Sequence, residues 1–231
     1  MHLILWIYNG IIKSNKRFVK KEMGKITDIQ KQKRNRTRVS IFIDGEFVCG
    51  LDEVAVLSAR LKVGDEITAD SLKSVMEKSE LNSAFERAVG YLSRGARAKK
   101  EIKKYLSDKG YDKDIIEQTI DKLCAYHYID DYMYAQSYIK SKSKKYGAYR
   151  LSAELRQKGI DKAVIDELLA ETPEDGIVEI AQKYLRSHKT ADKQKLKRFL
   201  AGRGFSWDSI NSAVEKLSDE LDSTQDYTDY D

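Results

Sequence analysis

The stretch LSAELRQKGI, residues 151–160, decides the fold because its pattern occurs twice more in the chain. The other copies are IKKYLSDKGY at 102–111 and LKRFLAGRGF at 196–205. Each copy has aliphatic residues eight and four positions before a glycine and a large apolar residue directly after it. The glycines are Gly110, Gly159 and Gly204, spaced 49 and 45 residues apart. A period of this length indicates tandem helical repeats.

The register around each glycine describes two helices and a turn. The residues at −8 and −4 lie on one face of a helix, and the glycine adopts the left-handed conformation that ends it. A basic residue precedes each glycine and suits the negative end of the helix dipole. A capping residue stands two positions after the glycine and begins the next helix. The basic residues are Lys109, Lys158 and Arg203, and the caps are Asp112, Asp161 and Ser206.

Each unit also has a helix upstream of the repeated stretch. The expected starts are Ser83 with Glu86 as a capping box, Asp130-Asp131, and Thr172 followed by Pro173 in the first turn. The sequence therefore predicts a mainly α protein with three tandem three-helix repeats, at 81–131, 132–171 and 172–217. Because one such unit is too small to be stable alone, we expect the units to stack into an elongated, curved body.

The preceding segment, residues 23–80, has the pattern of a small β-rich module. Two β-prone runs flank Asp44-Gly45, which is a strong hairpin signal. Asp52 is expected to cap a short helix through Ala59, with Val54 and Leu57 facing inward. A basic cluster in this module can either contact phosphate or solvate an edge strand, and the second reading is favoured. The cluster consists of Lys31, Lys33, Arg34, Arg36 and Arg38.

Charge and composition differ at the two ends of the chain. Residues 1–22 hold a short apolar run followed by lysines and arginine, an order opposite to that of a signal peptide, and we expect translation to start at Met23. Residues 218–231 hold six acidic and no basic residues and are expected to be disordered. The net charge of the chain is +5, so the remainder carries +11, which favours an anionic partner.

The sequence offers no set of residues for catalysis. The three histidines are scattered, and His127 is expected to pack among tyrosines. Cys49 and Cys124 form no CxxC pair, and we expect both to be reduced in a cytoplasmic protein. No phosphate-binding glycine loop and no zinc-type ligand spacing occur. The prediction is therefore a protein that is not an enzyme and that uses no metal or other cofactor.

Three stretches of the chain resemble the RecX family. They are YLSRGARAKKEI at 91–102, YIDDYMYA at 128–135 and YGAYRLSAELRQKGI at 146–160, within a similarity that runs from about Ala84 to Leu217. The last stretch is the most specific because it joins the repeat register to particular polar residues. The chain departs from the family pattern at Gly95-Ala96, where Arg-Pro is usual, and at Ala148, where proline is common.

The resemblance implies three tandem three-helix repeats and a regulatory function in DNA repair and homologous recombination. A RecX protein is expected to lodge, as a monomer, in the groove of the filament that RecA forms on DNA. It would impede extension of the filament and lower the recombinase, ATPase and co-protease activities of RecA, including those of the SOS response. No membrane partner is implied.

A groove binder needs exposed positive charge along one face, because the filament encloses DNA and displays acidic protein surface. Basic residues on the first and second helices of the repeats meet that need, whereas a single surface lysine more often only solvates its helix. The candidate residues for partner or DNA binding are Arg94, Arg97, Lys100, Lys104, Lys144, Lys145, Arg150, Arg156, Lys158, Lys195, Arg198 and Arg203.

Two other readings of the sequence stay open. The helix–glycine–helix pattern is superficially that of a helix-turn-helix protein that binds DNA directly, although its third helices carry acidic residues that would repel phosphate. Those acidic residues are Asp114, Glu117, Asp121, Asp166 and Glu167. The other reading is a generic helical scaffold for protein interactions, against which the unequal spacing of the repeats argues.

Overall fold

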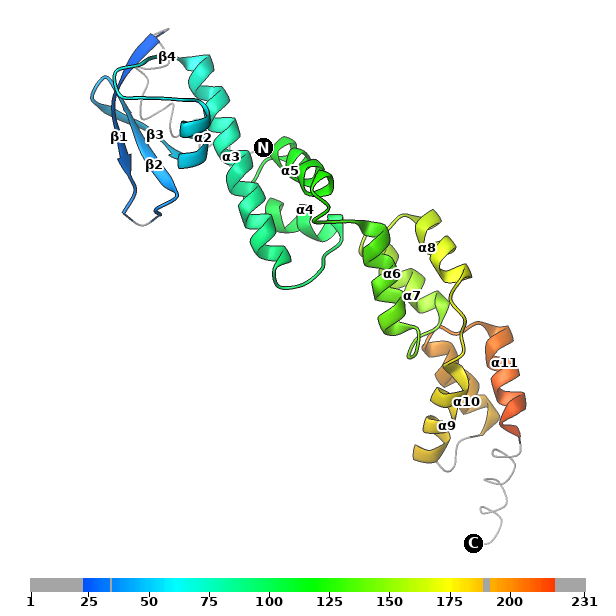
Figure 1. Cartoon of the computed structure of the whole chain (residues 1–231). Coiled ribbons are helices and arrows are strands. Elements are labelled where there is room, and N and C mark those ends of the chain that lie inside the picture. Colours follow the sequence, from blue (N-terminus) through cyan, green and yellow to red (C-terminus); the bar gives the residue numbers. More distant parts are fainter. Residues whose placement is uncertain (1–22, 34, 189–191, 219–231) are drawn as a thin grey trace. The chain divides into compact units, whose positions relative to one another are not determined.

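The computed structural model describes residues 23–33, 35–188 and 192–218 (Figure 1). The predicted extension at 1–22 and the predicted acidic tail beyond Ser218 lie outside the described residues. The chain divides into two compact units. The first contains the described residues up to Arg97 together with 101–129, and the second contains residues 98–100 and the chain from Asp130 onward.

The first unit opens with a four-stranded antiparallel sheet in the order β3-β2-β1-β4. The strands are β1 (Met23–Lys31), β2 (Arg38–Ile43), β3 (Glu46–Asp52) and β4 (Glu66–Thr68). Asp44 and Gly45 both have positive φ, at 51° and 85°, which is the conformation of a type I′ hairpin turn and confirms the predicted hairpin. Strand β1 was not predicted, and its Ile26 is fully buried in the core of the sheet.

Helix α2 (Glu53–Ser58) follows the sheet and is capped as predicted, since the Val54 amide donates to the Asp52 side chain. The predicted inner face of this helix is wrong. Val54 and Leu57 are exposed, whereas Ala55 and Val56 are buried against the sheet. One turn and a half of helix is too short for its period to set the buried face, so its packing on the sheet decides the orientation.

Helix α3 (Ala69–Leu92) joins the sheet to the first repeat, as Figure 1 shows. Its first half buries Leu72 and Val75 in the core of the sheet, and its second half buries Ala84 and Ala88 in the core of the first repeat. The prediction that a helix starts near Ser83 is wrong. The helix begins fourteen residues earlier, where the Ser71 amide donates to the side chain of Thr68.

The three repeats have the predicted order of helices. The first adds α4 (Lys99–Asp108) and α5 (Lys113–Ala125) to the second half of α3. The second contains α6 (Asp131–Lys142), α7 (Ala148–Gln157) and α8 (Lys162–Ala170), and the third contains α9 (Ile177–Ser187), α10 (Lys193–Gly202) and α11 (Trp207–Lys216). The repeat glycines have φ of 88°, 86° and 83°, and the leucines four positions before them are fully buried. The predicted register is thereby confirmed.

Some helices start where the sequence predicted and others do not. Asp130 caps α6 as predicted, accepting from the amides of Tyr132 and Met133. The predicted helix start at Thr172-Pro173 is wrong, because α9 begins at Ile177 after Gly176. The Thr172 hydroxyl instead donates to the Leu168 carbonyl and extends the end of α8.

The prediction for His127 is also wrong. Its side chain is exposed, and its backbone has a φ of 57° directly after α5. The Tyr128 amide donates to the Leu123 carbonyl at 2.9 Å and the His127 amide donates to Cys124. This pattern ends a helix through a left-handed residue, a position that glycine usually fills. His127 therefore terminates α5 rather than packing in a core.

Candidate partner-binding surface

The basic residue before each repeat glycine lies over an aromatic ring of its own repeat. Lys109 lies 5.6 Å from the Tyr105 ring, Lys158 lies 5.6 Å from Tyr134, and Arg203 lies 4.8 Å from Phe199. A cation held over the negative face of a ring is stabilised there by about 0.5–1 kcal/mol at an exposed site. Each of the three cations is therefore held beside the turn of its own repeat.

The rings that receive these cations occupy one register position in two repeats. Five residues before the glycine stand Tyr105 and Phe199, which stack on Tyr91 and Tyr184 with ring centroids 4.2 and 4.1 Å apart. The second repeat has Glu154 at this position. A hydrogen bond replaces the stack there, since the Tyr138 hydroxyl donates to Glu154 at 2.5 Å.

This hydrogen bond changes the titration of both partners. Burial, and then the hydrogen bond to the Glu154 carboxylate, raise the pKa of Tyr138 to about 12. The same bond, assisted by Arg150, lowers the pKa of Glu154 below its ordinary value. Glu154 is therefore ionised at neutral pH and stays available to pair with Arg150.

Several cations gather around the Tyr146 ring in the second unit. The Arg150 guanidinium lies 4.0 Å from the ring centroid and its Nε donates to Glu154 at 3.0 Å. Lys142 lies 5.7 Å and Arg203 lies 5.9 Å from the same ring. Arg203 belongs to the third repeat, so the Tyr146 ring collects positive charge from two repeats.

The backbone of the third repeat fixes this arrangement. Arg203 Nη1 donates to the Lys145 carbonyl at 3.2 Å, and the Gly147 amide donates back to the Arg203 carbonyl at 3.0 Å. The Tyr149 amide donates to the Gly204 carbonyl at 3.1 Å. The turn of the third repeat thus lies directly against the start of α7.

A carboxylate completes this contact. Glu174 accepts hydrogen bonds from the Ala148 amide at 2.9 Å and from the amide and hydroxyl of Ser206 at 3.3 and 3.1 Å. Burial would raise the pKa of Glu174, but these bonds and one from Ser209 outweigh it and hold the pKa below its ordinary value. One side chain therefore caps both α7 and α11. We call residues 145–150, Glu174 and 203–207 the second junction.

The second unit contains an equivalent contact at its start. The amide of Lys99, the first residue of α4, donates to Asp131 at 2.9 Å, and Lys100 Nζ donates to the Gln157 carbonyl at 3.1 Å. The Lys100 side chain also lies against Gly159. We call residues 98–100, Asp131 and 157–162 the first junction.

The structure brings some of the predicted binding residues together and leaves others apart. Lys145, Arg150 and Arg203 meet at the second junction, and Lys100 lies at the first. Arg97 lies over the Tyr91 ring at 4.9 Å, in the first unit. The remaining candidates are separate, exposed positions on the helices and loops: Arg94, Lys104, Lys144, Arg156, Lys195 and Arg198. Lys158 is half-buried on its two tyrosine rings.

Sequence reasoning missed the residues that position these cations. Tyr146 and Glu154 lie inside the stretch that resembles the family, yet neither was proposed for the site. The aromatic residues at the position of Tyr105 and Phe199 were visible in the repeat register and could have been found there. Glu174 gives no local signal, because its hydrogen-bond partners lie 26 and 32 residues away.

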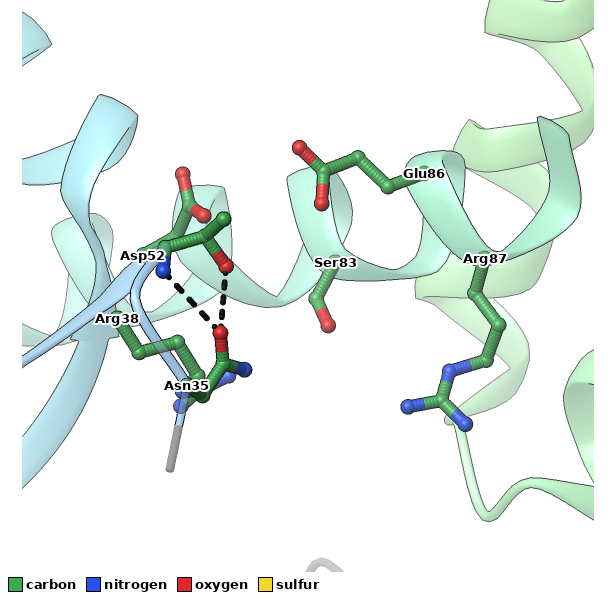
Figure 2. A pocket seen from close by; sticks show the side chains of 7 residues that line it. Asn35, Arg38, Asp52, Ser83, Glu86 and Arg87 are labelled. Carbon is green, nitrogen blue, oxygen red and sulfur yellow. Dashed lines mark hydrogen bonds between the residues drawn. The ribbon is translucent and has the colours of Figure 1, made fainter. Parts of the chain in front are cut away.

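One residue of the predicted basic cluster, Arg38, borders a hollow of about 310 Å³ in the first unit (Figure 2). Arg38 lines it but donates to the Gly50 carbonyl at 2.6 Å, and Asn35 accepts from the amide and hydroxyl of Thr37. Asp52, Glu86 and Arg87 also line the hollow, and Figure 2 shows Glu86 and Arg87 pointing apart. With carboxylates beside the arginines, this hollow does not have the uniform charge of a phosphate site. Arg34 of the cluster lies outside the described residues.

The described residues hold neither a membrane-spanning helix nor a cluster of metal ligands. No helix among residues 23–33, 35–188 and 192–218 is long and apolar enough to cross a membrane. Over the same ranges, no group of three or more His, Cys, Asp or Glu side chains is placed to hold a metal ion. Cys49 and Cys124 are free thiols, and burial raises the pKa of Cys49 to about 12.

Comparison with known proteins gives one family across the chain. Four domain models match: the regulatory protein RecX N-terminal domain at residues 24–68, and the first, second and third three-helix domains of RecX at 84–123, 130–169 and 174–214. The N-terminal match extends the likeness beyond the segment in which the sequence resemblance was strongest.

Relatives and solved structures agree with these models. The regulatory protein RecX of Clostridium botulinum (strain Eklund 17B / Type B) is 33% identical over 204 residues, which cover 84% of this chain and 96% of the relative. That of Clostridioides difficile (strain 630) is 33% identical over 205 residues, with the same coverage. A crystal structure of regulatory protein RecX matches with a TM-score of 0.68 and 28% identity, over 85% of this chain and 99% of that one. RecX from Lactobacillus salivarius matches with a TM-score of 0.56 and 26% identity, over 60% and 97%.

Proposed function

The chain belongs to the RecX family of regulatory proteins, and on that premise we propose that it regulates the recombinase RecA by binding along the groove of the RecA–DNA filament. It acts as a monomer in the cytoplasm and makes or breaks no covalent bond of its own. Bound in the groove, it bridges neighbouring RecA subunits, impedes extension of the filament and lowers its ATPase, recombinase and co-protease activities.

The observation that carries this proposal is the collection of cations around Tyr146. Arg150 and Arg203 come from two repeats and are held by a ring, a carboxylate and a backbone carbonyl. Side chains ordered before binding lose less conformational entropy when a partner arrives. A preorganised arginine pair suits the carboxylates and phosphates that a nucleoprotein filament presents, because guanidinium groups bind both in a planar, two-pronged manner.

The direct DNA-binding alternative finds less support. In a helix-turn-helix protein the helix after the turn enters the major groove. Here the acidic residues of those helices face outward and pair with lysines, as in Lys103–Glu117 and Lys162–Asp166. A helix that presents such carboxylates would repel the phosphate backbone, so we favour a protein-containing partner over naked DNA.

The deciding experiment is ATP hydrolysis by RecA on single-stranded DNA, titrated with this protein. Inhibition at fewer than one molecule per RecA subunit is expected, because one molecule in the groove bridges neighbouring subunits and impedes extension of the filament. Unchanged hydrolysis at saturation, together with tight binding to naked DNA, would contradict the proposal and favour direct DNA binding.

Charge reversal tests which residues take part. The double variant Arg150→Glu/Arg156→Glu is expected to inhibit RecA at least tenfold less well, since each reversal replaces an attraction by a repulsion worth about 1 kcal/mol or more. Lys73→Glu in α3 makes the same kind of change on an exposed helix face outside the proposed surface and should leave inhibition unchanged. Circular dichroism checks that all variants keep their helices. Full inhibition by the double variant would remove both arginines from the surface.

A further inference from the structure

Two aromatic side chains at the second junction are unusually exposed. Tyr149 is 69% exposed and Trp207 is 61% exposed. Their backbones are nevertheless fixed, because the Tyr149 amide donates to Gly204 and Trp207 follows Ser206, the cap that is bonded to Glu174. Large rings therefore face solvent from rigid positions, which is the arrangement of a preformed binding surface rather than of a mobile loop.

The fold itself does not require aromatic residues at these two positions. In the repeat register, Tyr149 corresponds to Lys100 and Trp207 corresponds to Lys162 at the first junction. Lys100 donates to the Gln157 carbonyl, and Lys162 pairs with Asp166 at 2.5 Å. Since equivalent places in the same architecture carry lysines, the architecture does not need an aromatic ring at either position.

The charges beside the two rings differ in sign. Arg150 adjoins Tyr149 in the sequence, and Lys144 and Lys145 lie in the loop before α7, whereas Asp208 directly follows Trp207 in the first turn of α11. A phosphate backbone crossing both rings would meet the Asp208 carboxylate. A protein surface can match both signs, and tryptophan, tyrosine and arginine are the residues that most often dominate protein–protein binding energy.

We infer that Tyr149 and Trp207 anchor a protein partner whose surface offers an apolar pocket bordered by carboxylates. The pocket receives the rings, and the carboxylates meet Arg150 and the neighbouring lysines. This inference rests on the proposed function, within which the partner is a subunit of the RecA filament. The anchors give the second junction a role in recognition that the first junction does not share.

The test compares alanine and lysine variants in the inhibition of filament ATP hydrolysis. Trp207→Ala and Tyr149→Ala are each expected to raise the concentration for half-inhibition about 30-fold, the loss typical of a buried aromatic anchor. Trp207→Lys and Tyr149→Lys copy the first junction and should be equally impaired, because a lysine cannot fill an apolar pocket. Lysine variants that bind as tightly as the wild type would assign the patch to nucleic acid and contradict the inference.

A spectroscopic readout separates docking from folding. With Trp6→Phe and 5-hydroxytryptophan at position 207, the fluorescence of this residue should shift to the blue on adding filament and stay unchanged on adding an oligothymidylate alone. Tyr126→Ala removes an equally exposed ring, 61%, from the first unit and should inhibit like the wild type. If the wild type inhibits and Tyr149→Ala/Trp207→Ala inhibits equally, the inference alone is wrong. A wild type that never inhibits contradicts the proposed function and the inference with it.

Discussion

The two junctions of the second unit share one arrangement of hydrogen bonds but differ in how closely they are packed. In both, a glycine turn lies against the start of a second helix, and a carboxylate accepts from the first amide of that helix, Lys99 or Ala148. Asp131 accepts from the Lys99 amide at the first junction, whereas Glu174 accepts from the Ala148 amide and also from the amide and hydroxyl of Ser206. The second junction is therefore the more constrained of the two.

The residue before each of these helices shows the same difference. Ala98 is fully buried at the first junction, so there is room for its methyl group. Gly147 holds the equivalent place at the second junction, where a Cβ would overlap the Gly204 carbonyl oxygen and the Phe205 backbone. A repeated architecture can therefore keep its hydrogen-bond scheme while one copy packs more closely and presents different side chains to solvent.

The largest expected loss of stability comes from adding a methyl group at Gly147, where the two repeats approach most closely. Gly147→Ala should destabilise the second unit by about 3 kcal/mol, because the atoms that it meets are backbone and cannot turn aside. The reverse change at the first junction, Ala98→Gly, should destabilise it by about 1 kcal/mol through the lost methyl group and the added backbone freedom. Urea unfolding followed by Trp207 fluorescence, in a Trp6→Phe background, measures both.

Gly202→Ala is the matched control for this pair. Gly202 ends α10 in the same unit and has open space around it, so alanine should be neutral or stabilise the helix by about 0.5 kcal/mol. If Gly147→Ala proved as harmless as Gly202→Ala, the two junctions would not differ in closeness and the comparison would fail.

The capping carboxylates give the next largest effect. Glu174→Ala leaves three donors without their acceptor and should destabilise the second unit by about 2 kcal/mol. Asp131→Ala removes one acceptor and should cost about 1 kcal/mol, the usual loss for a helix cap. Hydrogen exchange at the Ala148 and Lys99 amides locates each loss. Equal losses from the two variants would show that Glu174 caps only one helix.

Lowering the pH is expected to have a smaller effect on the stability of the second junction. The pKa of Glu174 is lowered in the folded protein, so its contribution is fully present above the unfolded value of about 4.3 and is lost as pH falls through the folded value. Between pH 7 and 5 stability should change little on this account, and below about pH 4.5 it should decline. Glu174→Gln should flatten that decline in urea unfolding at pH 7, 5, 4 and 3, whereas a decline of unchanged steepness would contradict the role of the carboxylate.

The features that the sequence predicted depend on residues close together in the chain. The buried leucines Leu106, Leu155 and Leu200 and the three left-handed glycines follow from helical periodicity and local backbone preference alone. The Ser83 start failed for an equally physical reason. A capping-box pattern can occur inside a helix, and packing of Leu72 and Val75 on the sheet extends α3 far upstream of it.

The basic residues of the site could be predicted from the sequence, but their contacts with other repeats could not. Periodicity showed that Lys158 and Arg203 stand at one register position, and the structure places both over rings. It did not show that Arg203 reaches the Lys145 carbonyl and the Tyr146 ring, since those partners lie in the preceding repeat, 58 and 57 residues away. Contacts between repeats need the turn of one repeat and the helix start of another, which no local pattern connects.

Replacing Lys158 and Arg203 tests the smallest expected difference in stability between the two junctions. Lys158→Met should destabilise the second unit by about 0.5 kcal/mol through the loss of its cation contacts with the rings of Tyr134 and Tyr138, because the aliphatic part of the side chain is kept. Arg203→Met should cost about 1.5 kcal/mol, because it also removes the hydrogen bond to Lys145 across the second junction. Urea unfolding of both variants gives the difference.

Arg203→Lys keeps the charge over the Phe199 ring. A lysine is shorter and lacks the fork of the guanidinium, so it cannot also reach the Lys145 carbonyl, and its loss of stability should fall between those of Lys158→Met and Arg203→Met. If Arg203→Lys matched the wild type, charge alone would hold the second junction, and the closer fit inferred from Gly147 and Glu174 would not extend to its arginine.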